Sequence, residues 1–155
     1  MRCLSALLLV VLAATVTAAA PIRGLAFVQD DATLRIGGRA IRLFGIYVPE
    51  TGETCRRYER PLRCGSRAAL ALERKARGFI HCQPKAVQSD RVMVAVCRAG
   101  ATPHSEGDDL SAYLLRHGWA VARPEAPFEY HALERIARER GLGIWGIPID
   151  RPLLR

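Results

Sequence analysis

Two adjacent glycines, Gly37 and Gly38, constrain the fold of this chain more than any other short feature. The segments on either side of them alternate between polar and apolar residues, and the apolar positions are Leu34, Ile36, Ile41 and Leu43. Alternating segments joined by a Gly-Gly pair predict a β-hairpin with a two-residue turn. Because neighbouring strand residues point to opposite faces, we expect Arg42 on the polar face, either towards a cleft or as a solvated surface arginine.

The N-terminal segment carries one early charge, Arg2, followed by an uninterrupted apolar run and small residues at Ala18 and Ala20. This pattern is typical of a secretory signal peptide over residues 1–20, cleaved after Ala20. A retained membrane anchor is the alternative, but the apolar run is shorter than the roughly 20 residues that a bilayer span needs. We therefore expect a secreted or periplasmic protein with no membrane span after cleavage.

The length of 155 residues allows one compact domain, which we place at residues 21–149, followed by a short tail over residues 150–155. Four cysteines follow the predicted leader, namely Cys55, Cys64, Cys82 and Cys97. An even number of cysteines in an exported chain favours disulfides, and four allow three connectivities. We favour Cys55–Cys64, which closes a short loop, and Cys82–Cys97, which joins two strands. The spacing lacks the C-x-x-C pairs of a zinc site.

Secondary-structure signals follow the hairpin in a clear order. Residues 47–65 are polar and turn-rich, which predicts a loop, and Ser66 then offers an N-cap for a helix over residues 68–77. Residues 79–82 and 92–97 are apolar and predict a second strand pair around a polar link. Asp108 or Asp109 caps a second helix, and Pro127 begins a third. The strands come first in the chain and the helices mostly later, and this order indicates an α+β domain with a small antiparallel barrel.

The chain is basic, with a formal net charge of +8, and nearly all of this charge comes from arginine. Such a balance attracts nucleic acids and other polyanions whatever their sequence, although it is also what an arginine-rich genome produces. The four histidines have neither H-x-H nor H-E-x-x-H spacing, and no phosphate-binding glycine loop is present. Composition therefore favours an anionic partner without identifying a catalytic motif. We expect a monomer.

Several segments occur in an order that resembles the staphylococcal nuclease (thermonuclease) family. They span Gly24 to Trp145 and read IRLFGIYVPE, CGSRAALAL, VAVC, DLSAYLLRHGWA and GLGIW. The resemblance implies a five-stranded OB-type barrel with three helices. It also implies calcium-assisted hydrolysis of phosphodiester bonds, in which carboxylates hold the metal, one carboxylate activates water and arginines offset charge on the phosphate.

Matched to the family's motifs, Arg42 is the first phosphate-binding arginine and Glu50 is the glutamate that activates water. The second arginine corresponds to Arg91 only if the chain is two residues shorter here than the family. Aligned without that deletion, Val92 stands at the arginine's position. Arg42 and Glu50 are therefore matched directly, and the match of Arg91 depends on the alignment.

The metal-binding positions depart from the family. Ala32 and Tyr47 stand where the family has its two calcium-binding aspartates, and neither a methyl group nor a neutral phenol is a suitable ligand for calcium. Asp31 replaces the missing carboxylate only if a one-residue bulge turns it inward. We therefore predict a non-catalytic binder of an anionic partner, which could be a nucleic acid, a polysaccharide or another protein, with no cofactor. The alternative is an exported nuclease that uses calcium at an altered site.

Overall fold

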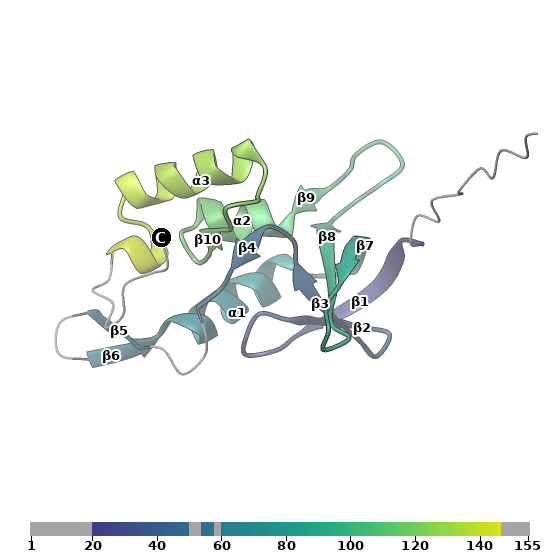
Figure 1. Ribbon diagram of the computed structural model, residues 1–155, viewed down its shortest axis with the longest axis horizontal. Coiled ribbons are helices and arrows are strands. Elements are labelled where there is room, and N and C mark those ends of the chain that lie inside the picture. Colours follow the sequence, from purple (N-terminus) through teal and green to yellow (C-terminus); the bar gives the residue numbers. More distant parts are fainter. Residues whose placement is uncertain (1–19, 50–53, 58–59, 147–155) are drawn as a thin grey trace, which may run out of the picture.

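The computed structural model describes residues 20–49, 54–57 and 60–146, with side chains described at 20–49 and 67–146. Five strands close into a barrel: β1 (Ile22–Val28), β2 (Leu34–Ile36), β3 (Arg39–Leu43), β7 (Phe79–Val87) and β8 (Met93–Ala99). Neighbouring strands are antiparallel except β3 and β8, whose parallel pairing closes the barrel. With three helices beside the barrel (Figure 1), the predicted α+β OB-like fold is confirmed.

The predicted Gly-Gly hairpin connects β2 and β3. Gly37 and Gly38 have φ angles of 57° and 79°, which are the left-handed values required at both central positions of a type I′ turn. Leu34 pairs with Ile41 across the hairpin, and both side chains are fully buried in the barrel. Arg42 is exposed on the opposite face, as the alternation predicts.

The predicted Cys82–Cys97 disulfide is present. The two cysteines lie directly opposite each other on β7 and β8, and both side chains are buried inside the barrel. The predicted Cys55–Cys64 bond lies outside the described side chains. So do most of the predicted leader and the tail over residues 150–155.

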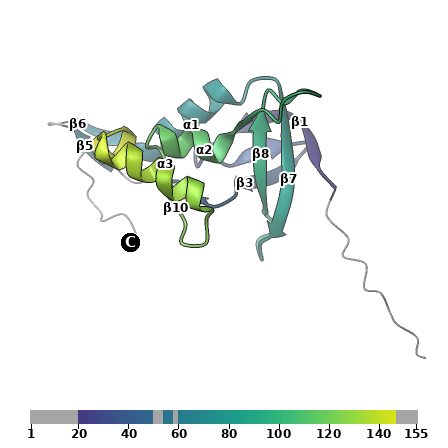
Figure 2. The same ribbon diagram turned by 90° about the horizontal axis from the view of Figure 1, so that it is seen from above.

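The helices α1 (Cys64–Lys75), α2 (Leu110–Arg116) and α3 (Phe128–Glu139) gather on one side of the barrel, as Figures 1 and 2 show. Of the two predicted candidates, Asp108 and Asp109, Asp109 is the N-cap of α2, because its Oδ1 accepts hydrogen bonds from the backbone N–H groups of Ser111 and Ala112. Pro127 precedes α3 as expected. Leu110 and Leu114 of α2 are fully buried in the barrel core. No helix in the described part of the chain has the length and hydropathy needed to cross a bilayer.

Two expectations need correction. The predicted loop over residues 47–65 contains an antiparallel pair, β5 (Thr54–Arg57) and β6 (Arg60–Arg63), and α1 begins at Cys64 instead of in the region of residue 68. The polar link after residue 82 is largely strand, since β7 runs on to Val87 past a bulge between Pro84 and Ala86. The end of β7 is mostly exposed and forms backbone hydrogen bonds without a buried face, so its side chains carry no alternating signal.

The smaller elements connect the helices to the barrel. They are β4 (Ile46–Tyr47), β9 (Asp108–Asp109), β10 (Val121–Ala122) and the 3₁₀ helix η1 (Gly143–Gly146). The pairing of β4 with β10 is the important one, because it brings the segment after the hairpin beside the segment between α2 and α3. These two segments form one wall of the site described next.

Candidate functional site

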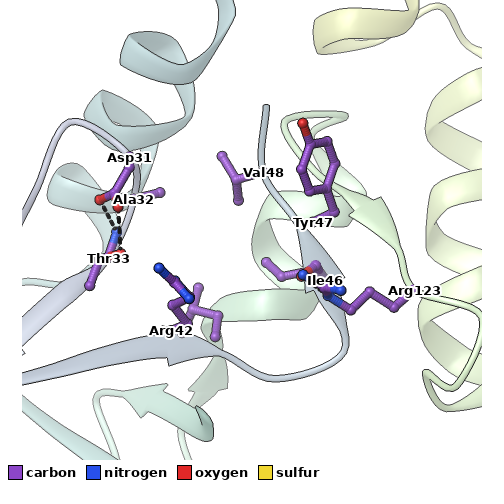
Figure 3. A pocket seen from close by; sticks show the side chains of 9 residues that line it. Asp31, Ala32, Thr33, Arg42, Ile46, Tyr47, Val48 and Arg123 are labelled. Atoms are coloured by element: carbon purple, nitrogen blue, oxygen red, sulfur yellow. Dashed lines mark hydrogen bonds between the residues drawn. The ribbon is translucent and has the colours of Figure 1, made fainter. Parts of the chain in front are cut away.

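A cavity of about 320 Å³ lies where the turn after β1, strand β3 and the β4–β10 pair meet (Figure 3). Its lining combines two guanidinium groups, one carboxylate and an apolar wall. The lining residues are Asp31, Ala32, Thr33, Arg42, Leu43, Ile46, Tyr47, Val48 and Arg123. Four residues singled out from the sequence (Asp31, Ala32, Arg42 and Tyr47) are therefore brought together.

Arg42 reaches the cavity from the outward face of β3. Its Nη1 donates to Gln88 Oε1 at 2.6 Å and to Asp90 Oδ2 at 3.1 Å, and both acceptors belong to the turn between β7 and β8. The ion pair is about half exposed, so its energetic contribution is small. A guanidinium carries five N–H donors, and the hydrogen bonds found among the described residues use one nitrogen. Within the described part of the chain, the other nitrogens of Arg42 are therefore open to a ligand.

Arg123 is a site residue that the sequence reasoning missed. It directly follows β10, where its backbone N–H donates to Gly45 O at 3.0 Å and its Nε donates to Ile46 O at 3.0 Å. These bonds hold the side chain against β4, where it lines the cavity. Among the described residues, no carboxylate forms an ion pair with Arg123. Only the β4–β10 pairing places it here, and this long-range contact leaves no local pattern in the sequence.

Glu134 of α3 holds the strand that carries Arg123. The residue is 8% exposed, and its Oε2 accepts a hydrogen bond from the backbone N–H of Ala122 at 2.7 Å. Its other oxygen pairs with Arg138 one helical turn later. A buried carboxylate satisfied on both oxygens therefore fixes β10 to α3 beside the site.

Tyr130 supports the opposite side of β4. Gly45 has a φ of 73°, and a Cβ atom at this position would lie 3.0 Å from the Tyr130 ring. The buried Tyr130 hydroxyl donates to Asp109 Oδ2 at 2.7 Å. Burial, together with this hydrogen bond and the negative charge of Asp109, raises the pKa of Tyr130 far above its ordinary value. The ring is therefore a neutral packing group that positions the wall of the cavity.

The turn before β2 occupies the position of the family's first metal-binding motif. Thr33 donates from its backbone N–H to Asp31 Oδ1 and from its hydroxyl to Asp31 Oδ2, both at 2.9 Å. Figure 3 shows these two bonds at the edge of the cavity. Ala32 is buried with a left-handed φ of 62°. The turn thus places a methyl group in the wall and engages both oxygens of its carboxylate with Thr33.

The described lining does not fit calcium. Calcium takes six to eight oxygen ligands, usually including several carboxylates, whereas Asp31 is the only carboxylate among the described lining residues. No group of three or more His, Cys, Asp or Glu residues gathers anywhere in the described part of the chain. Arg42 and Arg123 also bring positive charge, which disfavours a cation and favours an anion.

The two remaining catalytic predictions stay predictions. Arg91 is exposed in the turn between β7 and β8, with a φ of 62° and its backbone N–H donating to Gln88 O. It is not among the described residues that line the cavity, whereas its turn neighbours Gln88 and Asp90 contact Arg42. Glu50 lies outside the described residues.

No family model matches the chain. The chain is 30% identical over 131 residues to the succinoglycan biosynthesis protein ExoI of Rhizobium meliloti (strain 1021). The aligned region covers 83% of this chain and 66% of that relative, so the chain spans just under two thirds of the relative's length. The similarity therefore relates the chain to a protein named for polysaccharide biosynthesis. Membership of the nuclease family stays a prediction from the resemblance, supported by the barrel alone.

Proposed function

We propose that this chain is an exported, non-catalytic protein that binds an acidic polysaccharide at the cavity between β3 and the β4–β10 pair. The observation that carries the proposal is the approach of Arg42 and Arg123 to one cavity from different elements. The name of the relative favours a polysaccharide over the other anionic partners that the basic charge would attract.

The two arginines would act differently on an anionic group. Arg42 would offer a carboxylate the guanidinium nitrogens that no described residue binds, as a fork with two parallel hydrogen bonds. Arg123, held by its Nε against Ile46 O, would present its terminal nitrogens with little further ordering, which lowers the entropic cost of binding. Arg42 must share its charge with Asp90, so Arg123 is the stronger of the two contacts.

The rest of the lining suits a sugar chain better than a hydrolytic reaction. Tyr47 and Val48 form an apolar strip opposite the Asp31 turn, as Figure 3 shows, against which the C–H face of a sugar ring would pack. Ala32 and Tyr47 take the positions of the resembling family's metal ligands, so the described lining lacks the carboxylates that would hold a cation for activating water. Binding without cleavage is the activity that these residues support.

The proposal is tested by titrating protein expressed from the full-length chain against fluorescein-labelled alginate, a carboxylate-bearing polysaccharide. Anisotropy should rise, and the affinity should fall steeply as salt increases, because binding releases counterions from the polymer. Arg123→Gln should weaken binding about tenfold or more, which corresponds to one charge-assisted hydrogen bond. Arg42→Gln should weaken it less, because Asp90 already neutralises part of its charge.

Arg135→Gln is the matched control, since Arg135 is an exposed arginine of α3 that does not line the cavity. It should leave the affinity within about twofold of the unaltered protein, reflecting only the change in net charge. Equal losses in Arg123→Gln and Arg135→Gln would show non-specific attraction and overturn the site. Tighter binding to single-stranded DNA than to alginate at equal charge would reject the polysaccharide as partner.

A further inference from the structure

A second cluster of basic side chains lies on the outer face of the barrel, away from the cavity described above. Arg23 on β1 is directly opposite His81 on β7, and His81 is directly opposite Arg98 on β8. Residues paired in this way share one face of the sheet, with Cβ atoms about 5 Å apart. The three strands therefore carry an unbroken row of two arginines and a histidine, which we call the basic row.

The basic row has little compensating negative charge. Arg23 and Arg98 lie on the two strands that flank His81, so two guanidinium groups face the same patch of surface and repel each other. Here the described residues supply one ion pair, Arg98 Nη2 to Glu106 Oε2 at 3.2 Å, and the Glu106 side chain is 82% exposed. No described carboxylate pairs with Arg23 or with His81. An incoming anion would relieve the repulsion that remains.

The basic row forms the floor of a pocket of about 610 Å³, with the β8–β9 loop as one wall. The loop holds a defined shape, because Thr102 and Ser105 exchange backbone hydrogen bonds of 2.8 and 3.2 Å. Gly107, with a φ of 78°, ends it where any Cβ atom would lie 2.5 Å from Ala99 O. The backbone of the fold therefore fixes the shape of this pocket, and among the described lining residues none is shared with the first cavity.

The pocket lining has the character expected of a site for an acidic sugar. Polar side chains that can bind hydroxyl groups, Gln83, Thr102 and Ser105, surround the basic row. Each of the two loop hydroxyls accepts a backbone N–H at 3.3 Å and keeps its own hydrogen to donate. Apolar surface from Pro21, Val96 and Pro103 completes the lining. A lone inorganic anion would use the charges but not the hydroxyl, amide and apolar groups, and it would fill little of the volume.

We propose that this pocket is a second, independent site that binds a single carboxylate-bearing sugar ring. The ring's carboxylate would lie across Arg23 and Arg98, accepting hydrogen bonds from both guanidinium groups, with His81 between them. Its hydroxyl groups would bind Gln83 and the β8–β9 loop, and its C–H face would pack on the apolar part of the lining. Glu106 would leave Arg98 for solvent or accept a sugar hydroxyl.

The test is isothermal calorimetry with glucuronate as ligand, compared with its uncharged methyl ester and with inorganic phosphate, on protein expressed from the full-length chain. Glucuronate should bind with one site attributable to the pocket, the methyl ester at least tenfold more weakly, and phosphate more weakly than glucuronate. Arg23→Gln and Arg98→Gln should each reduce glucuronate affinity about tenfold or more. Arg135→Gln, on α3, should not change it.

Arg123→Gln separates this site from the proposed function, because it should weaken alginate binding at the first cavity while leaving glucuronate binding unchanged. Loss of glucuronate binding in Arg123→Gln but not in Arg23→Gln would overturn the second site and support the first. Equal affinity for phosphate and glucuronate would reject the sugar as ligand.

A measurement on the unaltered protein guards against misfolded variants. The ring protons of His81 should shift in NMR spectra when glucuronate is added and should shift less at the same concentration of the methyl ester. Absence of that shift at saturating glucuronate would overturn the proposal.

Discussion

The buried carboxylate of Glu134 offers the sharpest test of how the site is held together. Glu134→Ala leaves the backbone N–H of Ala122 without its acceptor and removes the ion pair to Arg138. A hydrogen bond to a charged group contributes about 1.5–3 kcal/mol, and a helical ion pair with an exposed partner adds at most about 0.5 kcal/mol. The variant should therefore lower the free energy of unfolding by about 2–3 kcal/mol.

The assay is urea unfolding followed by tryptophan fluorescence, with two matched variants. Glu134→Gln keeps an oxygen for the Ala122 N–H and loses only the charge, so it should cost about 1 kcal/mol. Glu139→Ala removes an exposed glutamate from the last turn of α3 and should change stability by less than about 0.5 kcal/mol. If Glu134→Ala costs no more than Glu139→Ala, the account of how α3 fixes β10, and with it Arg123, is refuted.

Three further predictions concern the core, the pH dependence and the metal positions. Replacing Cys82 and Cys97 together by Ala should lower the free energy of unfolding by about 3 kcal/mol, given their separation of 15 residues; an unchanged urea midpoint would contradict this. Folding raises the pKa of Tyr130, so the stabilisation that comes from keeping its hydroxyl protonated is complete below the ordinary tyrosine pKa of about 10. This stabilisation decreases progressively as the pH rises above that value. Tyr130→Phe should therefore show a shallower fall in urea midpoint between pH 9 and 11, and parallel curves for the two proteins would count against it. Replacing Ala32 and Tyr47 together by Asp should make thermal stability respond to calcium, a response absent in the unaltered protein; no response would mean that the cavity differs from a calcium site at more than these positions.

Local signals in the sequence were enough for the barrel. The Gly-Gly turn, the alternation around it and the Asp109 cap each depend on neighbouring residues, and all three are found where they were predicted. The Cys82–Cys97 bond followed from two apolar segments that were expected to pair. The extension of β7 to Val87 lacked this signal, because its last residues are mostly exposed and bury no alternating face.

The site was predicted only in part, because it depends on contacts between distant segments. Arg42 and the substitutions at Ala32 and Tyr47 could be read from motifs, and the cavity brings all three together. Arg123 is brought to the cavity by the pairing of β4 with β10, and the basic row on the outer face depends on the register of three strands. Neither the pairing nor the register leaves a periodic pattern in a single sequence.

The central claim is that the Arg42–Arg123 cavity binds an anionic polymer without calcium and without cleaving it. The most direct test measures the affinity for labelled alginate in chelator. Alginate and labelled single-stranded DNA are then each incubated with the protein in calcium, and the length of each polymer is checked after the calcium has been chelated. The account predicts alginate binding in chelator, a tenfold or greater loss in Arg123→Gln, and polymers of unchanged length. Calcium-dependent shortening of either polymer, abolished by Glu50→Ala, would contradict it and establish the chain as an active hydrolase.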